Sequence, residues 1–144
     1  MFSKTCEYGL RAMIYIAQQS NEKNRVSLVE IAEKINSPAP FTAKILQQLV
    51  KNELIKSNKG PTGGFEIEET KLNLIKLSDI VNVLDGNSIY QGCGLGLKEC
   101  NEKEPCPLHF KFAEIREKLK IMLESTTLMN LINDVDSINL GIKL

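Results

Sequence analysis

The residues with the clearest capacity for chemistry are three cysteines and a histidine, spaced Cys93-x6-Cys100-x5-Cys106-x2-His109. Thiolates and imidazoles are ligands that iron–sulfur clusters and zinc ions take in proteins. Zinc motifs usually contain tight C-x2–4-C pairs, which are missing here, whereas iron–sulfur ligation tolerates wider gaps. We therefore expect an iron–sulfur site, with a zinc site, redox-active thiols or unremarkable loop cysteines as the alternatives.

The fourth ligand of such a site has two candidates. His109 is the only histidine of the chain and follows Cys106 by three residues, at the start of an expected helix. The positive end of that helix favours a thiolate at Cys106. Glu7 is the rival, if a dimer brings the first helix of one subunit to the loop of the other. Cys6 lies on an apolar stripe of that first helix, which predicts a buried structural thiol.

A second pattern follows along residues 27–52. Ser27 and Glu30 have the spacing of a capping box ahead of a short amphipathic helix, and Pro38 ends that helix. Another helix from about 40 to 52 completes a helix-turn-helix pattern. The polar face of the second helix of such a motif contacts base edges. The residues expected to do so are Thr42, Ala43, Lys44 and Gln47.

A glycine-rich turn comes next. Strand-like stretches at 54–57 and 65–68 flank Asn58-Lys59-Gly60-Pro61-Thr62-Gly63-Gly64, which predicts a β-hairpin. A hairpin in this position is the wing of a winged helix, whose basic groups hold phosphate. The further residues expected at DNA are Lys51, Lys56, Lys59, Gly60, Pro61, Gly63 and Gly64. The alternatives are a helix face that is merely solvated, or a winged helix that binds another protein.

The elements that must position these residues are mostly helical. Apolar periodicity predicts helices at about 3–20, 77–84 and 107–124, and a last short helix through 133. The fold class is therefore mainly α with a small β-hairpin: a winged helix-turn-helix plus a long C-terminal helix. We divide the chain into a DNA-binding unit at 1–76 and a unit at 77–144 that contains the cysteine loop, about 87–106.

Composition and charge narrow the class of protein. The chain has 144 residues, of which 42% are apolar and 25% charged, so disorder is not expected. The net charge of zero hides an imbalance, because residues 1–76 carry 11 Lys/Arg against 8 Asp/Glu, whereas residues 77–144 carry 7 against 10. No apolar run approaches the length of a membrane helix, and the start lacks a secretory pattern. We expect a cytoplasmic protein with no membrane partner.

The sequence does not support catalysis. It contains no C-x-x-C redox pair. The run from Gly60 to Gly64 leads into a strand rather than a helix, so it is not a phosphate-binding loop. We therefore expect no enzyme.

Three stretches, Tyr8-x-Leu10-Arg11-Ala12, Ile31-Ala32-Glu33 and Lys59-Gly60-Pro61-Thr62-Gly63-Gly64-Phe65, resemble the Rrf-two family of bacterial transcription regulators. The likeness continues through the cysteine triad to Thr126-Thr127-Leu128. This resemblance implies a homodimer in which the long helix, about 107–124, forms the interface. It also implies that the dimer binds a pseudo-palindromic operator in double-stranded DNA.

The same resemblance implies a regulatory iron–sulfur cluster on Cys93, Cys100 and Cys106, with a 2Fe–2S cluster favoured over 4Fe–4S. Such a cluster senses nitric oxide, redox state or cluster supply, and it is often lost in air. His109 and Glu7 both match ligand positions of cluster-binding members, so the fourth ligand stays open. The gap of six residues after Cys93 is one longer than is usual. A cluster-free regulator with redox-active or zinc-binding cysteines is the alternative.

Overall fold

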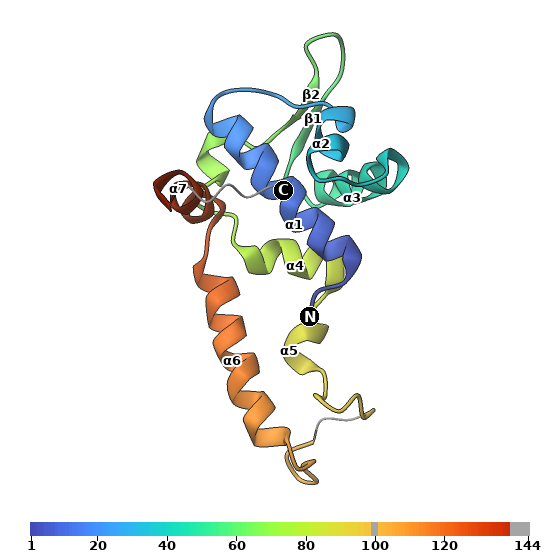
Figure 1. Ribbon diagram of the computed structural model, residues 1–144, viewed down its shortest axis with the longest axis vertical. Coiled ribbons are helices and arrows are strands. Elements are labelled where there is room, and N and C mark those ends of the chain that lie inside the picture. The colour runs from blue at the N-terminus through green and yellow to red at the C-terminus, as the bar shows by residue number, and fades with distance from the viewer. Residues whose placement is uncertain (99–100, 139–144) are drawn as a thin grey trace.

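Helix α1 (Lys4–Asn21) lies at the centre of the fold (Figure 1), a computed structural model that describes residues 1–98 and 101–138. The N-cap residue Ser3 accepts a hydrogen bond from the Cys6 backbone N–H at 3.0 Å. That bond satisfies one of the donors that the first turn of a helix leaves free. The helix predicted at about 3–20 is confirmed. Its fully buried side chains are Cys6, Ala12, Met13, Ile16 and Ala17.

The predicted helix-turn-helix is formed by α2 (Leu28–Lys34) and α3 (Ala39–Lys51). Ser27 caps α2 by accepting the Glu30 backbone N–H at 3.2 Å. Between the helices Asn36 has a φ of +52°, a left-handed conformation that asparagine adopts more readily than most residues. The chain therefore turns within a short connection, and both helices pack against α1. Their apolar sides add Ile31, Ile35, Ile45, Leu46 and Leu49 to the main core.

The predicted wing is an antiparallel hairpin of β1 (Lys56–Asn58) and β2 (Gly64–Glu66). On the other side of β2, Val26 makes a two-way backbone pair with Phe65: the Val26 N–H donates to the Phe65 carbonyl at 3.1 Å, and the Phe65 N–H to the Val26 carbonyl at 2.7 Å. The wing is therefore joined to the loop between α1 and α2 as well as to α3.

The strands differ from those predicted at 54–57 and 65–68. Leu54 belongs to the turn after α3, because its N–H donates to the Leu49 carbonyl at 3.0 Å. Ile55 is buried in the main core and makes no strand pair. Leu54 and Ile55, which the apolar pattern assigns to a strand, thus form the tight turn after α3.

After the hairpin, the elements are a 3-10 turn, η1 (Glu69–Lys71), and helices α4 (Leu77–Asp85), α5 (Ser88–Gln91), α6 (His109–Ser125) and α7 (Leu128–Ile138). Helix α4 packs along α1, α6 extends away from the body, and α7 returns to α1 (Figure 1). The three predicted helices are confirmed, and α5 lies within the segment predicted as a loop. Within residues 1–98 and 101–138, no helix has the length and apolarity needed to cross a membrane.

The main core crosses the predicted boundary after residue 76. Ile80 of α4 and Leu128 and Ile132 of α7 are buried in the same cluster as the apolar side of α3. Thr127 starts α7 in a reciprocal cap, because its hydroxyl accepts the Asn130 N–H at 3.1 Å and its own N–H donates to the Asn130 side chain. The boundary at 76 therefore does not coincide with an edge of this core.

A smaller core joins α1, α4 and α6. Its fully buried members are Cys6, Val81 and Leu123. Burial, reinforced by the nearby Asp85 carboxylate, raises the pKa of the Cys6 thiol to about 12. The prediction that Cys6 is a buried structural thiol is confirmed by its full burial in this core.

Candidate functional site

The chemistry-bearing residues lie at opposite ends of the molecule. Helix α3 and the wing form one end of the long axis, and the cysteine loop lies at the other, beyond α5 and the start of α6 (Figure 1). Any influence of the loop on the wing end must therefore pass through the packed helices between them.

Helix α3 presents a polar face to solvent. Ile45, Leu46 and Leu49 are buried on one side. The exposed side carries Lys44, Gln47, Gln48 and Lys51, and Ala43 is half-buried at its edge. Amide and ammonium groups on one helix face suit base edges and phosphates respectively. Helix α3 is held by α1, because the Tyr8 ring packs edge-on against the Phe41 ring with 5.6 Å between the ring centroids.

Thr42 is buried, although the sequence predicts that it contacts a base. Its side chain is fully buried, and its hydroxyl donates to the Pro38 carbonyl at 3.0 Å, the usual partner of a helical threonine. Neither its methyl group nor its hydroxyl is open to a base, so the predicted base contact is wrong. The spacing Thr42, Ile45, Leu46, Leu49 already has the i, i+3, i+4, i+7 period of a buried face.

The wing tip depends on glycine at three positions. Gly60 has a φ of +95°, and Gly64 has a φ of +132°. A Cβ at Gly63 would lie 2.3 Å from the Asn58 carbonyl oxygen, and one at Gly64 would lie 2.8 Å from the Val26 carbonyl oxygen. These glycines therefore shape the hairpin, and Lys59 and Pro61 are exposed at its tip.

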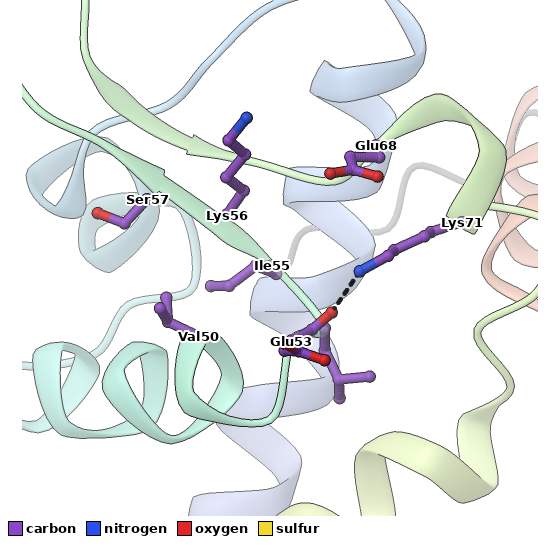
Figure 2. A pocket seen from close by; sticks show the side chains of 8 residues that line it. Val50, Glu53, Ile55, Lys56, Ser57, Glu68 and Lys71 are labelled. Carbon is purple, nitrogen blue, oxygen red and sulfur yellow. Dashed lines mark hydrogen bonds between the residues drawn. The ribbon is translucent and has the colours of Figure 1, made fainter.

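A hollow of about 320 Å³ lies between the end of α3 and the base of the wing (Figure 2). Glu53 and Glu68 contribute carboxylates to it, and Lys56 and Lys71 contribute ammonium groups. The Lys71 ammonium donates to the Glu53 carbonyl at 2.8 Å, as the dashed line shows. Because the two charge signs balance, the hollow itself does not favour an anion such as phosphate. Lys56 extends from β1 above it.

At the other end, the structure brings two of the predicted ligands together. Cys93 and Cys106 are both half-buried, whereas Cys100 lies outside the described residues. Hydrogen bonds from the backbone of Leu95 and Leu97, followed by one from the Cys106 thiol, hold the pKa of Cys93 below its usual value. Backbone donors around a sulfur favour the thiolate, which is the form that binds metal. The donor chemistry therefore fits a metal centre.

The cysteine loop is attached to α6 at two points. The Arg116 guanidinium donates to the Gly92 carbonyl at 2.6 Å. Gly94 lies against the Phe112 ring so closely that a Cβ there would be 2.3 Å from a ring carbon. A glycine is required at this close approach. The loop therefore follows α6 rather than hanging free of it.

The two candidates for a fourth ligand lie in different places. His109 is the first residue of α6 and is only 6% exposed. Its backbone N–H donates to the Cys106 carbonyl at 3.0 Å. Glu7 lies on α1 and pairs with Lys4 at 3.0 Å. Among residues 1–98 and 101–138, no three histidine, cysteine or acidic side chains gather as a metal site. Of the predicted metal ligands, the structure thus brings Cys93 and Cys106 together.

Sequence comparison places these features among known proteins. A profile of the Rrf2 family, described as an iron-dependent transcriptional regulator, matches residues 2–134. A protein of Aquifex aeolicus (strain VF5), provisionally named an HTH-type transcriptional regulator, is 33% identical over 135 residues, with 92% of each chain covered. The HTH-type transcriptional regulator IscR of Pectobacterium atrosepticum is 25% identical over 134 residues, covering 93% of this chain and 80% of IscR.

Solved structures with the same fold include two regulators. CymR (YrzC), described as the global cysteine regulator of B. subtilis, is 28% identical with a TM-score of 0.75, covering 92% of this chain and 96% of CymR. T. potens IscR is 25% identical, also with a TM-score of 0.75, covering 98% of this chain and 92% of IscR. The similarity therefore extends from the wing end through the cysteine loop.

The close approach at Gly64 generates a prediction about stability. Replacing Gly64 with Ala should lower the free energy of unfolding by about 1–3 kcal/mol, through its positive φ and the contact with the Val26 carbonyl. Gly60→Ala is the matched control, because Gly60 also has a positive φ but nothing lies within 4 Å of its Cβ position. Urea unfolding of both variants measures the difference. Equal losses would show that the contact at Gly64 is easily relieved.

Proposed function

Because the chain belongs to the Rrf2 family of transcriptional regulators, we propose that it is a homodimer that binds DNA through α3 and the wing and is controlled by an iron–sulfur cluster in its cysteine loop. The observation that carries the DNA-binding part is the exposed polar face of α3 beside a glycine-shaped wing. A bacterial regulator of this kind acts in the cytoplasm, where the DNA is.

The proposed contacts follow from chemistry and exposure. Gln47 suits the edge of an adenine, and Ala43 suits a thymine methyl group. Lys44, Lys51 and Lys56 suit phosphates, and Lys59 enters a minor groove from the wing tip. Gly60, Pro61, Gly63 and Gly64 give that tip its shape. Lysine lacks the planar fork of arginine, so Lys59 makes a point-charge contact and not a bidentate one.

Helix α6 supports a dimer because it is apolar on more than one side. Leu119 and Leu123 pack in the smaller core, and Phe112 packs against Gly94 of the cysteine loop. Phe110 and Ile121, together with Ile115 and Met122, are exposed by 47–69%. Large apolar side chains exposed on a second side of a helix indicate a further contact surface, so a second copy of α6 is the proposed cover.

A 2Fe–2S cluster is the proposed effector of the cysteine loop. Similarity to two IscR proteins and the paired Cys93 and Cys106 thiols support it. Cys100 is the third ligand of this proposal, and either His109 or the partner subunit's Glu7 completes the set. When bound, such a cluster supplies a centre that responds to nitric oxide, redox state or cluster supply. The chain's own part is to convert the loop's state into a position of α6, and thereby the spacing of the two α3 helices.

The similarity to CymR supports a second candidate function. CymR is described as a cysteine regulator, and its fold matches this chain as well as that of IscR does. Two adjacent thiols, Cys93 and Cys106, also suit a redox-sensing or zinc-binding pair. On this alternative the chain is a cluster-free DNA-binding regulator, and α3 and the wing act in the same way.

The DNA-binding proposal predicts distinct effects for base and phosphate contacts. Gln47→Ala should cost about 1–3 kcal/mol of affinity for a preferred duplex and relax preference at one base pair. Lys51→Ala should weaken binding to all duplexes and reduce the salt slope by about one. Fluorescence anisotropy is suitable, with a duplex of about 30 base pairs selected by the wild type from a random library.

Lys76→Ala is the control for these variants, since Lys76 is exposed at the start of α4 and lies outside α3, the wing and α6. It should leave the affinity and the salt slope unchanged. The proposal fails if the wild type retains no duplex above background in the selection, or if Lys76→Ala weakens binding as much as Lys51→Ala.

The cluster proposal predicts a coloured protein after anaerobic purification. Absorption spectra with iron and sulfide analysis should give about two irons and two sulfides per chain, and Cys93→Ala or Cys106→Ala should abolish both. Cys6→Ala is the matched control, because Cys6 is buried in the core and should leave the cluster in place. Colourless protein that holds zinc, or no metal, would favour the alternative function.

The dimer proposal predicts that charge on α6 separates the subunits. Ile121→Lys should raise the dimer dissociation constant by about 10- to 100-fold, because it places a charge in a covered apolar interface. Val29→Lys is the control, since Val29 is similarly exposed on α2. Sedimentation equilibrium measures both. Dissociation by Val29→Lys alone would assign the interface to α2 instead.

A further inference from the structure

One ionic contact reaches the wing from the loop between α1 and α2. The Arg25 Nε lies 3.0 Å from Oε2 of Glu66 on β2, and Arg25 Nη1 donates to the Thr62 carbonyl at 3.2 Å. A single guanidinium therefore holds both a strand and the tip of the hairpin. Its planar fork suits this use, since two donors act in fixed directions.

Glu66 is the centre of this network. Its second oxygen, Oε1, accepts from the Asn58 side chain at 3.2 Å, so the carboxylate joins β1, β2 and the α1–α2 loop. Lys56 is its direct cross-strand neighbour. These groups, the Arg25 hydrogen bond foremost, hold the pKa of Glu66 below its usual range, so the carboxylate is charged at neutral pH.

The wing needs such a contact because its two short strands stabilise each other only weakly. A two-stranded hairpin is only marginally stable by itself in water. Here three residue pairs join the strands, Val26 and Phe65 pair on the outer side, and Ser20 accepts the Ile67 N–H at 2.9 Å. None of these bonds involves residues 59–63 at the tip of the hairpin. The Arg25–Thr62 hydrogen bond connects the described network to the tip.

We propose that Arg25 is a positioning residue that fixes the angle and tip of the wing through Glu66 and Thr62, and that it is not itself a phosphate contact. The inference rests on the proposed DNA-binding function of the wing. An ordered wing loses less conformational freedom when DNA binds, so the contact raises affinity without touching the DNA.

Removing the Glu66 carboxylate tests the proposal by the sign of its effect. If Glu66 acted only as a negative charge near DNA, Glu66→Ala would tighten binding. If it positions the wing, Glu66→Ala should weaken binding by about tenfold. Glu68→Ala is the matched control, because Glu68 is an exposed glutamate two residues further along the same segment. Glu68→Ala should bind as tightly as the wild type or slightly more tightly.

Arg25 variants test the statement that Arg25 is not itself a phosphate contact. Arg25→Gln should weaken binding by about tenfold with the salt slope unchanged, whereas loss of a phosphate contact would lower the slope by about one. Arg25→Gln combined with Glu66→Ala should be no weaker than either single variant, since both remove one network. The probe is the duplex of about 30 base pairs selected by the wild type.

Hydrogen exchange at the wing amides separates this inference from the proposed function. Exchange of the Gly63 amide, which donates to the Gly60 carbonyl at the tip, should accelerate at least fivefold in Arg25→Gln and Glu66→Ala, and stay at the wild-type rate in Glu68→Ala, whether or not the protein binds DNA. Tighter binding by Glu66→Ala, a reduced salt slope in Arg25→Gln, or unchanged exchange would each overturn the proposal. Arg25→Lys replaces Arg25→Gln if the latter does not fold.

Discussion

The burial of α1 on several sides is the constraint on which the rest of the structure depends. The helix-turn-helix, β2, α4 and α7 all contact it. Gly9 shows how close this packing is, because a Cβ there would lie 2.1 Å from a Leu84 methyl carbon. The absence of a side chain at Gly9 lets the Leu84 side chain of α4 pack directly against α1. Since α4 also contacts α6, the long helix and the wing end share one rigid support.

That arrangement gives a physical route between the two ends of the molecule. The cysteine loop is fixed to α6 through Arg116 and Phe112, α6 packs on α4, and α4 packs on α1. Helix α1 in turn holds α3 through Tyr8 and Phe41. The loop is therefore linked to α3 by packed elements at every step, and such contiguous packing is one physical basis for coupling between distant sites.

Local patterns predicted the helices well, because caps and apolar periods act over a few residues. Ser27 caps α2 as its spacing from Glu30 predicts. Contacts between segments distant in the chain have no such pattern: the Val26–Phe65 pair and the Arg25–Glu66 ion pair join residues about 40 apart. Thr42 was predicted at a base edge although it shares the helical period of the buried side chains Ile45, Leu46 and Leu49. For the cysteine loop, residue types and spacing predict the class of ligand, and the choice between His109 and the partner subunit's Glu7 stays a prediction.

The return of α7 to α1 has a consequence for how the chain folds. Leu128 and Ile132 complete the same core as Ala12 and Ile16, so contacts of very high sequence separation must form before that core is closed. High contact order slows folding, because loop closure costs entropy before the contacts repay it. On the ribosome, the helix-turn-helix is synthesised early but lacks its α7 cover until residue 132 has emerged. The core beneath the helix-turn-helix is therefore complete only when almost the whole chain has been made.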